Sequence, residues 1–221
     1  MTNLFSIFDP STSLMNMKLN WLISMLSLMI MSSPFWLMNN RHMIMWKNMT
    51  MKMYMEFKTI MDKNMMTIMF MSLLPMIMIN NTLGLFPHLF TSTSHLSMTL
   101  TLALPMWLSY MLYGWLKNTN HMFTHLTPLG TPNALMPFMV CIETISNMIR
   151  PGTLAVRLSA NMIAGHLILS LLGNTILKMD INMMWMMLLI QMLLLTLEIA
   201  VAMIQGYVFT VLSILYSKEV N

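Results

Sequence analysis

Long apolar stretches fill most of this chain, and the polar segments between them are short. The runs at residues 19–38 and 96–116 contain no Asp, Glu, Lys or Arg. As helices that rise about 1.5 Å per residue, both runs can cross a hydrocarbon core about 30 Å thick. The pattern therefore predicts an all-α, polytopic membrane protein with a single membrane domain over residues 1–221.

The same pattern divides this domain into parts. A first transmembrane helix is expected over residues 14–38, an amphipathic surface helix over 41–63, a two-helix transmembrane hairpin over 65–116 and a long tilted hairpin over 134–216. Basic residues outnumber acidic ones in the surface helix, and methionines recur there at helical intervals, as in helices that lie in a membrane interface. Because basic loops stay on the inner side, the N-terminus is expected outside and the C-terminus inside.

The two arms of the long hairpin exceed the length of a perpendicular span. If they are wholly helical, segments 134–172 and 181–216 are about 58 and 54 Å long, so they must tilt, bend or lie partly along the interface. Gly173 and Asn174 are expected to form the reversal between them. Pro137 and Pro151 are candidate kink positions in the first arm.

Composition supports this assignment and suggests a compartment. Hydrophobic residues make up 57% of the chain and charged residues 8%, which leaves too little polar surface for a soluble domain. Thirty-five methionines stand where Ile, Leu or Val are usual, as a mitochondrial genetic code would produce. Residues 1–13 carry Asp9 and no basic residue, unlike a secretory or transit peptide. We therefore expect a product of the organelle, with the matrix as the inner side.

The ionisable residues of the long hairpin are the candidates for chemistry. They are Glu143, Arg150, Arg157, His166 and Glu198, with Asn161 and Gln205 as neutral polar companions. At about 100° per residue, Glu143, Arg157 and Asn161 share one face of the first arm, whereas His166 lies on the opposite face.

This arrangement suggests two water-filled half-paths at different depths. Arginine never loses its charge, so Arg157 suits a fixed electrostatic barrier, while His166 and Glu198 can relay protons near neutral pH. The alternative is a buried polar network of Arg157, Glu198 and the amides that only holds the hairpin together.

Small residues flank Arg157 at a spacing of four. Ala155 pairs with Ser159, and Ala160 pairs with Ala164. Such pairs allow a close helix neighbour. That neighbour is either the other arm of the hairpin or a helix of another subunit.

Several other classes of site are excluded or unsupported. The basic residues do not interleave with exposed aromatics, so no nucleic-acid partner is expected, and a single cysteine, Cys141, excludes a disulfide framework. His121 and His125 lack a third ligand and are interpreted as an exposed pair, and His88 and His95 are placed in an outer loop where they cannot form the axial pairs of a membrane haem protein. With no phosphate-binding glycine loop, no cofactor is expected, and any ATP chemistry belongs to a partner.

Three motifs carry a resemblance to a known family. They are Ile-Glu-Thr-Ile-Ser at residues 142–146, Ile-Arg-Pro-Gly at 149–152, and Arg-Leu-Ser-Ala-Asn-Met-Ile-Ala-Gly-His at 157–166. The chain resembles subunit a of mitochondrial ATP synthases, insect versions above all. The likeness extends along nearly the whole chain, through residues 8–10, 84–87, 90–95 and 215–219.

This resemblance implies a stator of the F0 motor in the mitochondrial inner membrane, with its N-terminus toward the intermembrane space. It implies contacts with the c-ring, other F0 and peripheral-stalk subunits, the lipid bilayer and protons. It implies that Arg157 is the essential charge beside Asn161 and Gln205, that Glu143 belongs to the matrix-side release path, and that His166 and Glu198 line the uptake path.

One point stands against that picture. Counting from the expected reversal places Glu198 nearer the level of Arg157 than that of His166. A structural membrane subunit of a respiratory complex is the alternative function, and its charges would serve only packing. A stand-alone secondary transporter is less consistent with the sequence, because repeated halves and paired broken helices are not visible.

Overall fold

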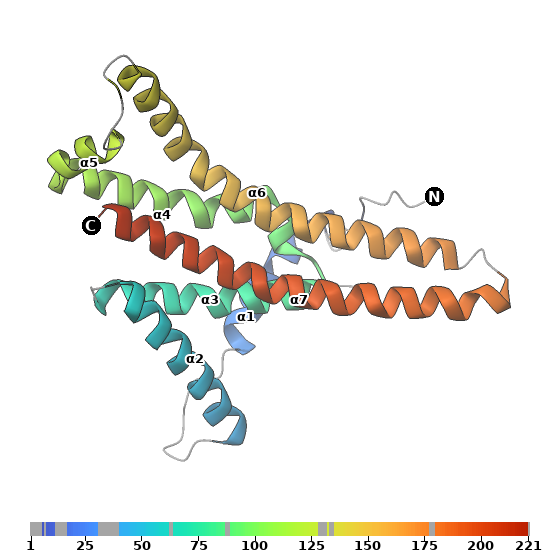
Figure 1. Cartoon of the computed structure of the whole chain (residues 1–221). Coiled ribbons are helices and arrows are strands. Elements are labelled where there is room, and N and C mark those ends of the chain that lie inside the picture. The colour runs from blue at the N-terminus through green and yellow to red at the C-terminus, as the bar shows by residue number, and fades with distance from the viewer. Residues whose placement is uncertain are drawn as a thin grey trace.

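A computed structural model of the chain describes residues 6, 8–11, 17–30, 40–61, 64–86, 89–127, 132, 135–176 and 180–220, with the backbone alone at 28, 64–66, 181 and 182. Within these ranges the regular structure is entirely helical (Figure 1). The helices are α1 (Leu22–Ile30), α2 (Arg41–Ile60), α3 (Asn64–Gly84), α4 (Leu96–Lys117), α5 (Thr119–Leu126), α6 (Met136–Ile176) and α7 (Ile181–Val220), with short 3₁₀ turns at η2 (Leu19–Trp21) and η3 (Ser92–Ser94).

Four of these helices are long and apolar enough to cross a membrane. The qualifying segments are Thr67–Gly84 in α3, Leu96–Lys117 in α4, Met136–Ile176 in α6 and Met183–Val220 in α7. The predicted class of an all-α polytopic membrane protein is confirmed.

The predicted first transmembrane helix is described only in part. Within residues 14–38, the structure shows η2 and α1, and the nine residues of α1 extend about 14 Å. Residues 14–16 and 31–38 lie outside the described part of the chain. A complete span here therefore stays a prediction.

Helix α2 diverges from the long helices (Figure 1). Phe57 and Met61, at its C-terminal end, are buried against the bundle, and Met45, Met49 and Met55 along its length are exposed. Asp62 and Lys63 of the predicted surface segment lie outside the described residues. The helix is thus attached to the bundle through one end.

The reversal of the long hairpin differs from the prediction. Gly173 and Asn174 lie inside α6, which continues to Ile176, and α7 begins at Ile181. A single glycine costs a helix only about 1 kcal/mol relative to alanine, which neighbouring good helix formers can offset. The chain therefore reverses between Ile176 and Ile181, and residues 177–179 lie outside the described residues.

The first part of α6 slants away from α7, and the remainder runs beside it (Figure 1). Pro151 lies inside α6 and removes one backbone hydrogen bond from its interior, which favours a bend. The change of direction brings the start of α6 near α5, while the later part stays against α7.

Close helix contacts hold the bundle together. Helix α3 packs on α7, and α6 packs on both α4 and α7. In lipid, such association depends on close van der Waals contact, and Gly206 of α7 supplies it, since a Cβ there would lie 2.6 Å from Cγ of Met78 in α3. Ala155 and Ser159 are buried in this packing, whereas Ala160 and Ala164 stay exposed. The pair Ala155 and Ser159 therefore packs within the chain's own fold, whereas the pair Ala160 and Ala164 remains exposed.

Candidate functional site

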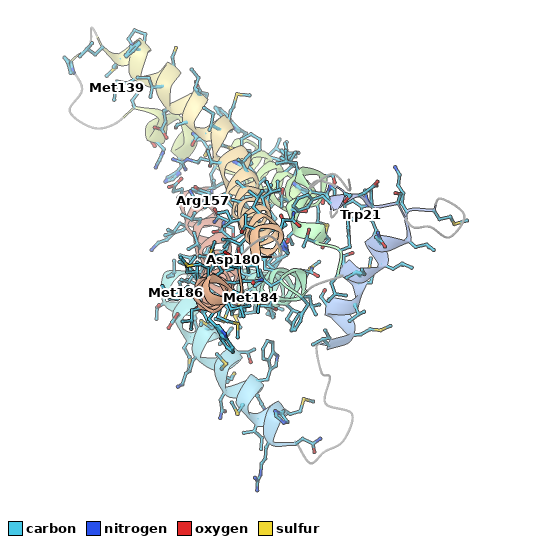
Figure 2. All side chains as sticks on the ribbon, turned by 90° about the vertical axis from the view of Figure 1, so that its right-hand side faces the viewer. Trp21, Met139, Arg157, Asp180, Met184 and Met186 are labelled. Atoms are coloured by element: carbon cyan, nitrogen blue, oxygen red, sulfur yellow. The ribbon has the colours of Figure 1, made fainter. Side chains whose placement is uncertain are left out.

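Arg157 projects from the middle of α6 on the side turned away from the bundle. The α6 residues that turn inward around it include Leu154, Leu158 and Met162, which are buried, while the Arg157 side chain is exposed. Among the described residues, no carboxylate lies within ion-pair distance of its guanidinium. In a view along the long helices, Trp21 lies on one side of α6 and Arg157 on the other (Figure 2).

One helical turn further along α6, a hydrogen bond joins the two arms of the hairpin. Nδ2 of Asn161 donates to Oε1 of Gln205 over 3.1 Å. Gln205 is 6% exposed and Asn161 is exposed, so the bond lies at the edge of the α6–α7 contact. The two amides predicted to lie beside Arg157 are thus paired with each other.

Glu198 of α7 is buried directly against Gly165 of α6. The carboxylate is 7% exposed, and a Cβ on Gly165 would lie 2.7 Å from its Oε1. Both carboxylate oxygens lack hydrogen-bond partners among the described residues. Unpaired buried carboxylates are costly and rare, and they mark functional positions in membrane proteins.

The axial level of Glu198 corrects one prediction. Counting from the expected reversal placed it nearer Arg157 than His166, yet it contacts Gly165, the residue before His166. The count failed because α7 is offset along α6 and because the reversal lies beyond Gly173. The structure therefore places Glu198 and His166 at neighbouring levels.

His166 lies on the opposite face of α6 from Arg157, as the helical periodicity predicts. Its ring is partly buried, and the ring of Phe8 meets it edge-on with centroids 6.2 Å apart. The backbone of Gly84, at the end of α3, also interacts with the ring. Its Nε2 lacks a hydrogen-bond partner among the described residues.

Two cavities adjoin these groups. His166 lines one of about 700 Å³, and Asn161, Gly165 and Glu198 line another of about 300 Å³. Leu85 lines both cavities and so lies where they approach each other. Each volume far exceeds the ~30 Å³ that one water occupies in the liquid, and the polar lining groups can hydrogen-bond to water.

A cluster of charges lies nearer the start of α6. Nη2 of Arg150 is 3.5 Å from Oε1 of Glu143, and Nη1 of Arg150 forms a second ion pair with Glu219 at the end of α7. The guanidinium carbon also lies 5.1 Å from the ring centre of Tyr216. Glu143 is thus tied to Arg150 and through it to α7.

The sequence made Arg150 a candidate without indicating its role, and it gave no indication of a role for Glu219. One signal was present, since Glu143 and Arg150 are seven residues apart and so share a helix face. The contribution of Glu219 depends on how far the end of α7 reaches along α6, which periodicity does not define. The slant of α6 and the length of α7 decide it.

The remaining candidates form no additional centre in the described residues. His121 and His125 of α5 have ring centres 6.3 Å apart, and no group of three or more His, Cys, Asp or Glu side chains gathers to hold a metal ion within the described ranges. His95 stacks on Phe90 with ring centres 5.1 Å apart, and His88 lies outside the described residues. Cys141 is a free, exposed thiol.

The chain is similar to known proteins along its whole length. A family model described as ATP synthase A chain matches residues 5–218. ATP synthase subunit a of Aedes aegypti is 61% identical over 225 aligned positions that cover all of both chains. The subunits a of Locusta migratoria and Drosophila melanogaster are 60% and 59% identical, and the alignments cover all of this chain and 99% and 100% of theirs.

Proposed function

The chain belongs to the family of ATP synthase subunit a, the proton-translocating stator subunit of F0, and from that premise we propose which of its residues carry the protons. The proposed pathway has an uptake half, a charged barrier and a release half. The uptake residues and the release residues lie at different levels along α6 and α7.

We place the chain in the mitochondrial inner membrane with its N-terminus toward the intermembrane space and its C-terminus in the matrix. Basic residues at Arg41, Lys47, Lys52 and Lys58 of α2 support this orientation, because basic loops stay on the inner side. The partner at the face of α6 that carries Arg157 is a ring of c subunits, each with a carboxylate. Other F0 and peripheral-stalk subunits complete the assembly.

Uptake begins in the cavity that His166 lines. His166 and Glu198 lie at neighbouring levels, and they line two different cavities that approach each other at Leu85. A proton that enters the cavity lined by His166 passes to the cavity lined by Glu198 and then to a ring carboxylate. Glu198 suits this transfer because its oxygens have no competing hydrogen-bond donor among the described residues.

The barrier is Arg157, and its position is the observation that carries the proposal. An arginine in a membrane span normally faces protein partners or water, because exposure to lipid costs several kcal/mol. The exposed Arg157 has no anionic partner within the described part of the chain, so its partner comes from another subunit. The fixed charge keeps an arriving carboxylate ionised and prevents protons from passing directly between the halves.

Release occurs near the cluster of Glu143, Arg150 and Glu219. The three charges lie toward the matrix ends of α6 and α7 in the proposed orientation, and their side chains are 25–39% exposed. A ring carboxylate that has completed the circuit gives its proton to water beside this cluster. Each proton crossing is worth about 2.3 kcal/mol per 100 mV, so rotation must combine several for one ATP.

The decisive experiment compares Arg157→Ala with Arg157→Lys and Arg41→Ala in assembled ATP synthase reconstituted into vesicles. We expect Arg157→Ala to abolish ATP-driven proton pumping and to retain or increase passive proton leak. Arg41→Ala, which removes an arginine from α2, should pump normally. Arg157→Lys should lose coupling in part, since ammonium keeps the charge and loses the guanidinium fork.

Coupled pumping at the normal rate in fully assembled Arg157→Ala would sink this proposal. The alternative of a structural respiratory-complex subunit is not favoured by the family assignment.

A matching test at the release half is Glu143→Gln. Unchanged proton flux in this variant at full assembly would remove Glu143 from the pathway.

A further inference from the structure

A short N-terminal segment, Phe8 and Asp9, lies on the side of α6 that carries His166. Phe8 makes an edge-on contact with His166, and the N–H of Asp9 donates to the carbonyl of Ser6 over 3.3 Å. Nδ2 of Asn20, in η2, donates to the backbone carbonyl of Asp9 over 3.4 Å. The segment is therefore held between η2 and α6, and the position of Asp9 is defined.

Asp9 is one of the residues that line the cavity in front of His166. The polar lining comes from several parts of the chain: Ser6, Asp9, Ser11, Asn20, His166, Ser170 and Gln191. Among the described residues that line this cavity, Asp9 is the sole carboxylate and His166 the sole histidine. The Asp9 side chain is exposed, so it lies at the open side of the cavity.

From this arrangement we infer that Asp9 is a positioning residue of the uptake half-channel, whose fixed negative charge gathers protons at the cavity mouth and stabilises protonated His166. The inference rests on the proposed function, because it assigns Asp9 to the uptake path that leads past His166. It adds a residue that lies outside the long hairpin and comes from the N-terminal segment.

The local hydrogen bonds keep Asp9 charged. Its Oδ1 accepts the backbone N–H of Ser11 at 3.1 Å, and this bond lowers the pKa of the carboxyl below its ordinary value of 3.8, with the charge of Lys18 acting in the same direction. Asp9 is therefore ionised throughout the physiological pH range. It cannot carry protons itself at neutral pH, and it acts through its field on His166 and on the water between them.

Two other charged groups lie near Asp9 and His166. The positive charge of Lys18 lies near Asp9 and opposes its field. Glu198 lies against Gly165, the residue before His166. Leu85 and Phe86, which directly follow α3 and line the cavity, are apolar, and Gln191 of α7 is neutral. Asp9 is therefore the negative charge among the described residues that line this cavity, on the side from which protons arrive.

The test measures ATP synthesis as a function of pH on the uptake side. Assembled ATP synthase is reconstituted into vesicles with its catalytic head outside, a fixed membrane potential is imposed, and the pH of the lumen is varied from about 5.5 to 8.5 around the titration of histidine. The variants are Asp9→Asn, Asp9→Glu and Asp180→Asn. Asp180, labelled in Figure 2, is the matched control, because it is exposed and directly precedes α7. It is not among the residues that line the cavity.

We expect Asp9→Asn to reduce the rate about threefold at lumen pH 8 and to leave it unchanged at pH 6, where protons are abundant. Asp9→Glu and Asp180→Asn should follow the wild-type profile. About 1 M salt in the lumen shortens the screening length to about 3 Å and should remove the Asp9→Asn deficit.

Three results would overturn the inference: an Asp9→Asn profile that coincides with wild type, an equal shift in Asp180→Asn, or a uniform loss at every pH with less assembled complex. Arg157→Ala is measured in parallel. Normal coupled pumping by that variant would refute the proposed function itself, whereas its loss together with an unchanged Asp9→Asn profile would refute the role of Asp9 alone.

Discussion

Nδ2 of Asn161 donates a 3.1 Å hydrogen bond to Oε1 of Gln205, and this bond fixes α7 against α6 one helical turn beyond Arg157. The bond links two residues 44 positions apart in the chain. Arg157 itself has no such link among the described residues, so its surroundings are set by the packing of these neighbours. Asn161 and Gln205 are thus paired with each other, whereas Arg157 has no such partner among the described residues.

The Asn161–Gln205 bond should make a measurable contribution to the stability of the hairpin. We expect Asn161→Ala and Gln205→Ala to show a coupling free energy of about 0.6–1 kcal/mol, as for other hydrogen bonds between membrane helices. A double-mutant cycle on the thermal dissociation of the assembled complex measures it. If the effects of the two substitutions on the stability of the complex simply add, the hydrogen bond contributes nothing to that stability.

Gly165 should be required for the position of Glu198. Gly165→Ala places a methyl group 2.7 Å from Oε1 of Glu198, so the carboxylate must shift, and we expect coupled proton flux to fall about tenfold. Gly173→Ala is the matched control, because a Cβ there meets nothing within 4 Å. That control should be neutral or should stabilise the helix by about 0.5–1 kcal/mol. Equal flux in the two variants would contradict the role given to Gly165.

Glu198→Gln should separate stability from function. The buried carboxylate has no hydrogen-bond partner among the described residues, so a neutral amide of similar size lowers the cost of burial. We expect thermal dissociation of the complex to stay at the same temperature or rise, while coupled proton flux falls about 100-fold. Glu56→Gln, on α2, is the control for charge removal. A Glu198→Gln variant with normal flux would remove Glu198 from the uptake path.

Arg150 should stabilise the ends of α6 and α7 by a modest amount. Its two ion pairs are partly exposed, with side chains 25–39% accessible, so we expect Arg150→Gln to cost about 1 kcal/mol and the cost to shrink at high salt. Glu219→Gln should destabilise the wild-type chain and have no such effect when Arg150 is already Gln. Thermal dissociation of the single and double variants at low and high salt measures these effects. Equal effects of Glu219→Gln in both backgrounds would show that the pair is not coupled.

The sequence determined the class of the protein and the chemistry available to it. Uncharged apolar runs require membrane helices, because backbone polar groups must be satisfied internally in lipid. The rarity of charge made Arg157, Glu143, His166 and Glu198 conspicuous. The helical period also placed His166 and Arg157 on opposite faces of α6, since a face depends only on spacing within one helix.

The tertiary structure alone decided which residues of different helices meet. Periodicity defines faces and leaves the axial offset between two helices undetermined, so the count along the chain misplaced Glu198, which lies against Gly165. The pairing of Arg150 with Glu219 and the packing of Phe8 on His166 depend on the same kind of long-range fit. Close contacts such as Gly206 with Met78 set that fit, because they decide how far one helix slides along another.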